Sequence, residues 1–188
     1  QENPFERTLF PTFDRELAID EHYPYLNDSP AHLRRIRWAY PIILKTGLNI
    51  LLHVKMGLRI RGREILKKHK QAFAHGAITI ANHVYRLDCP CVLLAVKAKH
   101  TTRIPMFAPN FRTKDNFFLN IVGGVPIPDS STNMSALKKF NEAFDEYNRR
   151  GWWFHIFPEA CRWDFYKPLR PFQKGAFTMS YKYNKPLL

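Results

Sequence analysis

The chain has 188 residues, enough for one domain with a buried core, and its content of 45% apolar and 14% aromatic residues argues against disorder. Its net charge of +13 predicts a polyanionic partner: a nucleic acid, an anionic membrane surface or a phosphorylated substrate. Three cysteines are too few for a disulfide framework and favour a reducing compartment. No apolar run approaches the roughly 20 residues of a spanning helix, and no signal-peptide pattern opens the chain, so we do not expect a secreted or membrane-spanning protein.

The first third of the chain predicts an irregular arm followed by a helix. Residues 1–34 are interrupted by prolines and show poor periodicity, which is typical of an arm. Residues 31–58 are rich in large apolar residues, and Lys45, Asn49 and His53 recur every four residues. On a helix those three side chains form one narrow polar stripe on an otherwise apolar cylinder.

Two interpretations of this helix remain open. It either packs onto the domain, or it lies in a membrane interface with Trp38 at the boundary and basic side chains on lipid headgroups. Our assignment is an arm over residues 1–34 and an amphipathic membrane-interface helix over residues 35–57.

The rest of the chain alternates short apolar runs with helical patterns. The runs predict strands or short buried segments over residues 58–62, 77–81, 104–107, 121–127 and 152–157. Helices are predicted over residues 90–99 and from a cap at residues 131–133 to a stop at Gly151. This alternation predicts an α/β domain over residues 58–188, with a mostly parallel or mixed central sheet flanked by helices. Active sites of such sheets gather at the carboxyl ends of the strands.

A histidine and an aspartate follow the predicted strand over residues 77–81. His83 and Asp88 are five residues apart across a strand-to-helix turn, a spacing that can bring imidazole and carboxylate within hydrogen-bond reach. The carboxylate would then fix the tautomer and leave the other ring nitrogen as a general base. On spacing alone, Asp88 can equally be a helix-start residue, or both cap and partner, and His83 a buried, hydrogen-bonded histidine.

The cysteines raise the question of a metal site. Cys89, Cys91 and Cys161 lie near chemically interesting residues, and His83 and His155 are available as further ligands. The Cys-Pro-Cys spacing is not that of a zinc knuckle, and a fourth ligand would be arbitrary. We therefore predict free thiols and no metal site.

Several sequence blocks together resemble a known family. In chain order they are Asn82-His83-(four residues)-Asp88, Gly124-Val-Pro-Ile-Pro-Asp129, Phe157-Pro158-Glu159-(two residues)-Arg162, Pro171-Phe172-Gln173-Lys174-Gly175-Ala176-Phe177 and Lys185-Pro186-Leu187-Leu188. This series resembles the glycerolipid acyltransferase family over roughly residues 58–188.

The resemblance implies transfer of a fatty acyl group between two substrates. The donor is a thioester on coenzyme A or acyl carrier protein, and the acceptor is a hydroxyl of a lysophospholipid such as 1-acyl-glycerol-3-phosphate. His83 matches the general base, and Asp88 matches the residue that orients and polarises it. The hydroxyl then attacks the thioester directly, without an acyl-enzyme. No cofactor or metal is expected beyond these substrates.

The resemblance also assigns substrate-binding residues. Arg162 matches an arginine whose guanidinium fork suits a lysolipid phosphate, and Glu159 matches an acidic neighbour that holds the glycerol part or orders the turn. A local salt bridge between Glu159 and Arg162 is the alternative. Gly124 and Lys174 fall within matching blocks and are assigned to substrate binding, with Gly124 also expected in a tight turn of positive φ.

The chain departs from the family pattern in its second block. That block commonly ends in an arginine, whereas Ser130 stands here after Asp129. A different lysolipid acceptor, an amino-acid-containing lipid or an inactive lipid-binding relative therefore remain alternatives, and Arg103 is among the cations that could compensate. The chain ends within the last block, so we expect the C-terminal part of the domain to be incomplete.

Charge and resemblance together predict where the protein works. We expect it on the cytoplasmic face of a membrane, as a peripheral or monotopic protein on anionic lipid. The sequence contains no aromatic ribonucleoprotein signature, zinc-finger spacing or helix-turn-helix signal, so we expect no nucleic-acid partner.

Overall fold

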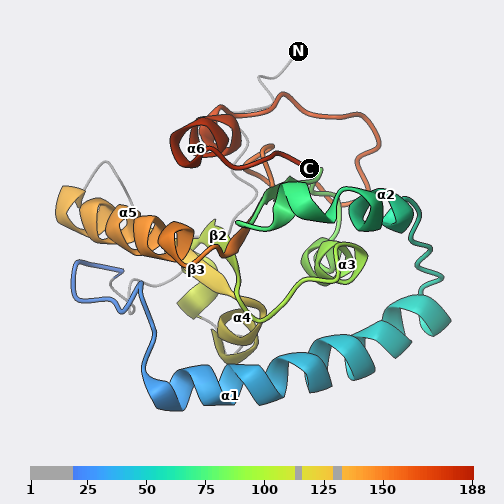
Figure 1. The fold of residues 1–188 in the computed structure, drawn as a ribbon, viewed down its shortest axis with the longest axis horizontal. Helices are drawn as coiled ribbons and strands as arrows, with labels where there is room; N and C mark the ends of the chain where they lie inside the picture. Colours follow the sequence, from blue (N-terminus) through green and yellow to red (C-terminus); the bar gives the residue numbers. More distant parts are fainter. Residues whose placement is uncertain (1–18, 113–115, 129–132) are drawn as a thin grey trace.

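The computed structural model describes residues 19–112, 116–128 and 133–188, and a parallel sheet lies at its centre (Figure 1). The strands are β1 (Ile78–Ile80), β2 (Thr102–Phe107), β3 (Gly124–Ile127) and β4 (Trp153–Ile156), in the spatial order β1-β4-β2-β3. Every paired neighbour is parallel. This confirms the predicted α/β class, and it places the carboxyl ends of all four strands at one edge of the sheet.

Helices cover both faces of this sheet. Their bounds are α1 (Pro30–Tyr40), η1 (Pro41–Leu48), η2 (Leu51–Lys55), α2 (Arg63–Lys68), η3 (Lys70–Phe73), α3 (Asp88–Ala95), η4 (Ala108–Arg112), α4 (Asn116–Val122), α5 (Met134–Arg149) and α6 (Gly175–Tyr183). On one face, Ile78 and Phe154 pack in a core with side chains of α5 and α6. On the other face, Ile104 packs in a second core with α1, η1, α3 and α4. Figure 1 accordingly shows α6 and the helix that begins with α1 on opposite sides of the strands.

Helix α5 forms as its sequence predicts. The side chain of Asn133 accepts a hydrogen bond from the N–H of Ala136 at 2.8 Å, which caps the first turn. The helix buries one stripe, namely Ala136, Phe140, Ala143, Phe144 and Tyr147. Gly151, with φ of 68°, follows its end.

A long helical segment runs from α1 through η1 and η2. Its later turns contain the i→i+5 hydrogen bonds of a π-helix, for example from the N–H of Asn49 to the carbonyl of Leu44. Apolar side chains are buried every four residues, at Ile36, Tyr40, Leu44 and Leu52, with half-buried Leu48 in the same series. Two residues out of phase lies a second apolar series that faces solvent, here called the outward stripe: Trp38, Ile42, Ile50 and Val54.

The outward stripe lies on the side of the helix opposite to the buried series. With about four residues per turn, a two-residue offset corresponds to half a turn. The segment therefore packs on the domain through one stripe and presents a second apolar stripe away from it. Within the described residues, no helix combines the length and the apolarity required to cross a bilayer.

Two predicted strands are wrong. Residues 58–62 form no strand and pair with no strand among the described residues: Leu58 and Ile60 pack on the second core, and their basic neighbours are exposed. The alternating pattern indicates that one side of the segment is buried, and such burial does not require pairing with another strand. The run 121–127 is divided by Gly123, whose φ of 93° ends α4 at Val122 before β3 starts. A short apolar run fits a buried helix turn as well as a strand.

Candidate active site

Two loops meet at the carboxyl edge of the sheet. One follows β1 and leads into α3, and the other follows β4. Because β1 pairs with β4 in parallel, with Ile80 opposite Ile156, the residues that follow these two strands come together. Phe157 contacts His83 from the second loop, and its ring lies parallel to the imidazole at a centroid distance of 4.0 Å. The sequence blocks around His83 and Glu159 are therefore neighbours in space.

His83 and Asp88 form a hydrogen-bonded pair. Nδ1 of His83 lies 3.0 Å from Oδ2 of Asp88, and both side chains are about one-fifth exposed, at 21% and 18%. The N–H groups of Val84 and Tyr85 also donate to Oδ2, each at 2.7 Å. Asp88 starts α3, so one oxygen orders the turn and also fixes the imidazole. With Nδ1 as the donor to a carboxylate, Nε2 carries the lone pair that a general base needs.

Glu159 holds the two loops together from inside. Its side chain is buried, Oε2 accepts the N–H of His83 at 3.2 Å, and Oε1 accepts the N–H of Arg170 at 3.3 Å. Both carboxylate oxygens therefore bind backbone groups of the chain itself. This geometry corresponds to the turn-ordering role, one of the two roles that the sequence left open for Glu159.

Arg162 stands on a loop that is attached to the loop of His83. The N–H of Trp163 donates to the carbonyl of His83 at 3.1 Å, and the N–H of Phe165 donates to the carbonyl of Val84 at 2.8 Å. The guanidinium is exposed, and its Nε lies 2.9 Å from Oδ1 of Asp164. The carboxylate that pairs with Arg162 thus belongs to Asp164 and not to Glu159, so the alternative of a local salt bridge with Glu159 is wrong.

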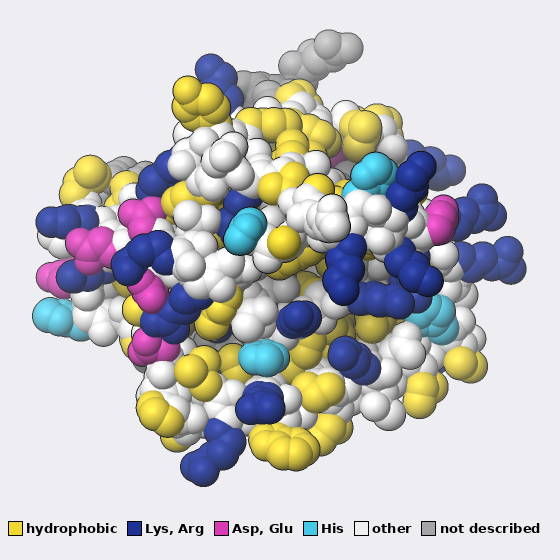
Figure 2. Space-filling model, in the orientation of Figure 1, with side chains coloured by type: hydrophobic (Ala, Val, Ile, Leu, Met, Phe, Trp, Pro, Cys, Tyr) yellow, Lys and Arg dark blue, Asp and Glu magenta, His cyan; other side chains and the backbone are white. Residues whose placement is uncertain are grey.

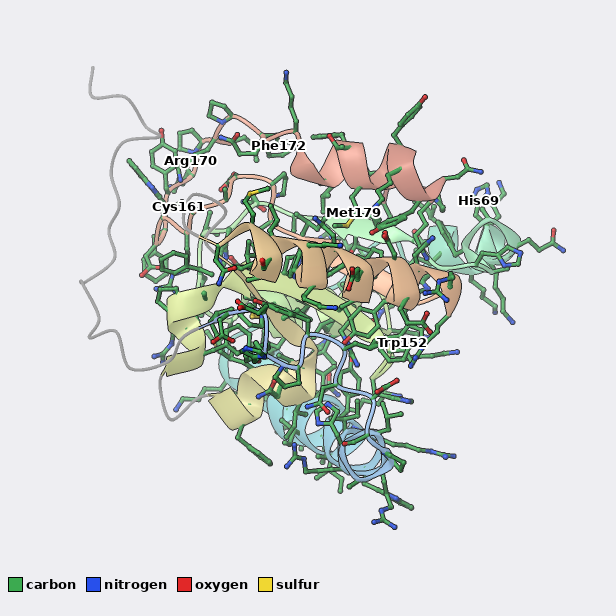
Figure 3. The ribbon with its side chains drawn as sticks, turned by 90° about the vertical axis from the view of Figure 1, so that its left-hand side faces the viewer. His69, Trp152, Cys161, Arg170, Phe172 and Met179 are labelled. Atoms are coloured by element: carbon green, nitrogen blue, oxygen red, sulfur yellow. The ribbon has the colours of Figure 1, made fainter. Side chains whose placement is uncertain are left out.

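The residue before Lys174 connects the start of α6 to the loop after β4. The N–H of Gln173 donates to the carbonyl of Pro158 at 2.7 Å, which joins the start of α6 to the loop after β4. Lys174 itself is exposed and stands at the N-cap position of α6. Figure 3 shows Cys161, Arg170 and Phe172 together on one side of the molecule. The backbone therefore brings five predicted site residues to one edge: His83, Asp88, Glu159, Arg162 and Lys174.

The family model described as Acyltransferase matches residues 57–188. The chain belongs to the glycerolipid acyltransferase family. Neither the curated proteins nor the solved structures contain a match to it. The matched region contains the entire sheet and both loops at its carboxyl edge. The pair formed by His83 and Asp88 thus lies within the acyltransferase domain, which makes this edge its candidate active site.

Gly124 does not join the other predicted site residues of the acyltransferase. It starts β3, and β4 and β2 lie between that strand and β1. A Cβ atom on Gly124 would lie 3.0 Å from both the carbonyl oxygen of Leu119 and the sulfur of Met106, so close packing requires glycine here. The predicted positive φ belongs to Gly123 instead, at 93°. Asp129 and Ser130 lie outside the described residues.

Arg103 does not replace the missing arginine of the second block. It lies at the amino end of β2, almost fully buried, with its guanidinium 4.9 Å from the ring of Tyr147 and 4.3 Å from that of Trp152. It donates to the carbonyls of His100 and Thr102. Burial lowers its pKa from the ordinary value. Arg103 therefore stabilises the fold at the sheet edge away from His83.

The sequence suggested His155 only as a possible metal ligand, whereas the structure places it beneath the carboxyl edge of the sheet. Its side chain is fully buried, its Nδ1 is 3.1 Å from the carbonyl oxygen of Thr79, and its ring packs edge-on against Phe157. Burial lowers the pKa of His155 to about 4, so this imidazole is neutral at physiological pH. The signal was present in the alternation of the run 152–157, where His155 points to the opposite face from Phe154.

All three cysteines of the acyltransferase are free thiols, as predicted. Burial raises the pKa of Cys89 to about 12, so this thiol stays protonated. Among the described residues, no group of three or more His, Cys, Asp or Glu side chains is placed to hold a metal ion.

Proposed function

We propose that this acyltransferase moves a fatty acyl group from a thioester, on coenzyme A or acyl carrier protein, to a hydroxyl of a lysophospholipid such as 1-acyl-glycerol-3-phosphate. One observation carries the proposal. The 3.0 Å hydrogen bond between Nδ1 of His83 and Oδ2 of Asp88 leaves Nε2 as a base on a partly exposed imidazole. Acyl transfer to an alcohol needs such a base, because a neutral hydroxyl is a poor nucleophile.

The proposed reaction is a direct displacement. Nε2 of His83 takes the proton of the acceptor hydroxyl while its oxygen attacks the thioester carbonyl, and a tetrahedral oxyanion forms. The carbon–sulfur bond then breaks, the thiolate leaves, and the imidazolium returns the proton to it. The carboxylate of Asp88 stabilises the imidazolium between these two steps. The ring of Phe157 and the Glu159 contact hold His83 in place.

The acceptor phosphate is assigned to Arg162. Its loop is hydrogen-bonded to the carbonyl of His83 itself, so the guanidinium and the imidazole are held on adjacent backbone. A planar guanidinium matches the oxygens of a phosphate in two parallel hydrogen bonds. Lys174, exposed at the start of α6, supplies a second cation to the same group. Asp164, which pairs with Nε of Arg162, has to be displaced or shared when the phosphate binds.

The membrane surface is assigned to the outward stripe. Val54 is 80% exposed and Trp38 is 69% exposed, although both are large apolar side chains. Exposed basic residues flank the stripe, namely Arg34, Arg37, Lys45 and Lys55. Apolar side chains with a basic border are the pattern of a helix that lies in an anionic interface. A bilayer-resident lysolipid would then meet the enzyme at the cytoplasmic face of a membrane.

Acyl transfer to a panel of lysolipids tests the proposal. A labelled acyl group is offered on coenzyme A and on acyl carrier protein to lysophosphatidate, to other lysolipids and to amino-acid-containing lipids. The parent is compared with His83→Ala and with His69→Ala, an exposed histidine on the other side of the molecule (Figure 3). We expect transfer that is lost only in His83→Ala. Transfer to another acceptor keeps the mechanism and changes the substrate. Folded protein that binds liposomes but transfers to no acceptor would identify an inactive lipid-binding relative.

A further inference from the structure

The amino ends of the strands border a cavity that the proposed reaction does not use. Its volume is about 770 Å³, and its lining includes Thr101, just before β2, and Trp153, the first residue of β4. His83 follows the carboxyl end of β1, so the cavity lies at the opposite edge of the parallel sheet. In Figure 3, Trp152 and His69 mark this edge, on the side away from Cys161 and Arg170. A cavity of this size accommodates a small organic ligand.

The border of the cavity is strongly basic. Exposed lysines line it from α2, η3 and the turn after α3: Lys67, Lys70, Lys97 and Lys99. Within the described residues, none of these lysines forms an ion pair with a carboxylate, and Glu64 is the one acidic residue of the lining. Figure 2 shows Lys and Arg side chains gathered over α2 and α3 with hydrophobic side chains between them. A multiply charged anion fits this border.

The floor of the cavity is apolar and partly aromatic. Phe73 and Trp153 lie there with ring centroids 5.6 Å apart, alongside Leu66, Val96 and Ala98. Arg63 fixes the wall because its guanidinium donates to the carbonyls of Leu94 and Ala95, at 2.7 and 3.3 Å, and thereby joins α2 to α3. An inorganic ion would leave this floor unused. The ligand therefore combines negative charge with a planar or apolar body.

Lys97 stands at a position where glycine is energetically favoured. The turn after α3 is a Schellman motif, in which the N–H of Ala98 binds the carbonyl of Leu93 at 2.8 Å and the N–H of Lys97 binds that of Leu94 at 3.2 Å. Lys97 therefore adopts a left-handed conformation, with φ of 52°. A side chain strains the backbone there, whereas glycine does not. A lysine at this position, with its side chain on the cavity, is consistent with a binding role.

We propose that this cavity binds a nucleoside phosphate, with the base on the Phe73–Trp153 floor and the phosphates on the lysines. The site goes beyond the proposed acyl transfer, because it lies at the strand ends opposite to His83. The aromatic floor favours a nucleotide over free phosphate. An anionic lipid headgroup is less suitable, because the outward stripe assigned to the membrane lies on the long helical segment, none of whose residues lines the cavity.

Fluorescently labelled ADP tests this site by equilibrium binding, with unlabelled ADP, pyrophosphate and adenosine as competitors. We expect saturable binding of one nucleotide per chain, which the double variant Lys67→Gln/Lys70→Gln weakens about tenfold or more. The matched control is Lys138→Gln/Lys139→Gln, which removes the same charge from exposed lysines of α5. The control is expected to bind like the parent. Acyl transfer is expected to be unchanged in both double variants, which keeps this test independent of His83.

Three results would overturn the nucleotide site. The first is absence of saturable binding to the folded parent protein. The second is equal weakening in both double variants, which would show diffuse attraction to the net charge. The third is displacement by pyrophosphate as effective as displacement by ADP, because pyrophosphate does not require the aromatic floor.

Lys97→Gly supplies a second, independent readout. Glycine relieves the left-handed backbone, so we expect a higher midpoint of thermal unfolding. The same change removes a lysine from the cavity, so we expect weaker nucleotide binding. A more stable variant that binds as tightly as the parent would remove Lys97 from the site. A higher midpoint of unfolding together with weaker nucleotide binding would support the assignment of Lys97 to the site.

Discussion

The imidazole of His83 lies flat on the ring of Phe157, with centroids 4.0 Å apart and an angle of 15° between the planes. Phe157 is the first residue after β4, and it also contacts the buried ring of His155 edge-on. The proposed general base is therefore restrained from two directions. Asp88 fixes its rotation through Nδ1, and Phe157 fixes the plane in which Nε2 can point.

The first prediction concerns that restraint. Phe157→Leu keeps an apolar side chain but removes the flat surface beneath the imidazole, so we expect kcat to fall about tenfold with KM nearly unchanged. Phe157→Tyr keeps the ring and serves as the matched control. Steady-state kinetics of acyl transfer check the prediction. A rise in KM with constant kcat would indicate instead that Phe157 contacts the substrate.

The second prediction concerns the charge of Asp88. Asp88→Asn retains an oxygen that can accept the N–H groups of Val84 and Tyr85, but it cannot stabilise an imidazolium. We expect the fold to persist and kcat to fall by about 10²- to 10⁴-fold. Circular dichroism and acyl-transfer rates measure the two effects separately. Near-normal activity of the folded variant would contradict the proposed role of Asp88.

The third prediction concerns the buried brace formed by Glu159. Glu159→Ala leaves the N–H groups of His83 and Arg170 without their acceptor, at a cost of about 1–3 kcal/mol for each buried group. Glu159→Gln keeps one side-chain oxygen, so its loss of stability should be smaller. Urea unfolding of the parent and both variants gives the comparison. If the alanine variant is as stable as the parent but has a higher KM for the acceptor, Glu159 binds the acceptor instead.

The fourth prediction concerns the dependence of stability on pH. Burial lowers the pKa of His155 from 6.5 to about 4, so the unfolded chain binds a proton in this interval that the folded chain does not. The contribution of His155 to stability is therefore complete above pH 6.5 and is lost as the pH falls toward 4. The shift corresponds to about 3 kcal/mol.

His155→Asn isolates this contribution, because asparagine does not titrate and keeps an N–H donor for the carbonyl of Thr79. Denaturant unfolding at several pH values between 7 and 4 measures the difference in slope. We expect the parent to lose more stability than the variant over this interval. Parallel curves for parent and variant would show that His155 binds its proton over the same pH range in the folded and the unfolded chain.

The fifth prediction concerns the membrane. Ile50→Gln/Val54→Gln makes the exposed end of the outward stripe polar without touching the buried series, so we expect weaker sedimentation with anionic liposomes and an intact fold. Ile65→Gln changes an isoleucine of similar exposure on α2 and serves as the control. If the double variant sediments like the parent, lipid contacts a different surface.

The accuracy of sequence-based prediction differed between local and distant contacts. The period of α5 and the hydrogen bond between His83 and Asp88 follow from spacings of a few residues, and both are present. The bond from His83 to Glu159 joins residues 76 positions apart, and no periodicity reports it. The second role of Glu159, on the N–H of Arg170, depends on an irregular loop path that composition does not determine.

The adjacent glycines also show what the sequence alone does not determine, namely the role of each single position. Gly123 and Gly124 are adjacent, and either one suits a turn when the sequence is considered alone. In the structure both positions are closely packed, since a Cβ atom would clash with the carbonyl oxygen of Thr102 at Gly123 and would lie 3.0 Å from that of Leu119 at Gly124. Only Gly123 has positive φ, where α4 ends before β3 enters the sheet. The sequence marks the pair as special but does not show which member has positive φ.

Because the long helix repeats about every four residues, its number of residues determines which way the outward stripe faces relative to the domain. One residue inserted after Thr46 would turn everything beyond it by about 90° relative to Tyr40 and Leu44. Ile50 and Val54 would then no longer face directly away from the domain, whereas Trp38, which precedes the insertion, would keep its orientation. An insertion of four residues would restore the alignment and only lengthen the segment. If the outward stripe lies in a bilayer as proposed, the number of residues in this helix sets the tilt of the carboxyl edge of the sheet relative to the membrane.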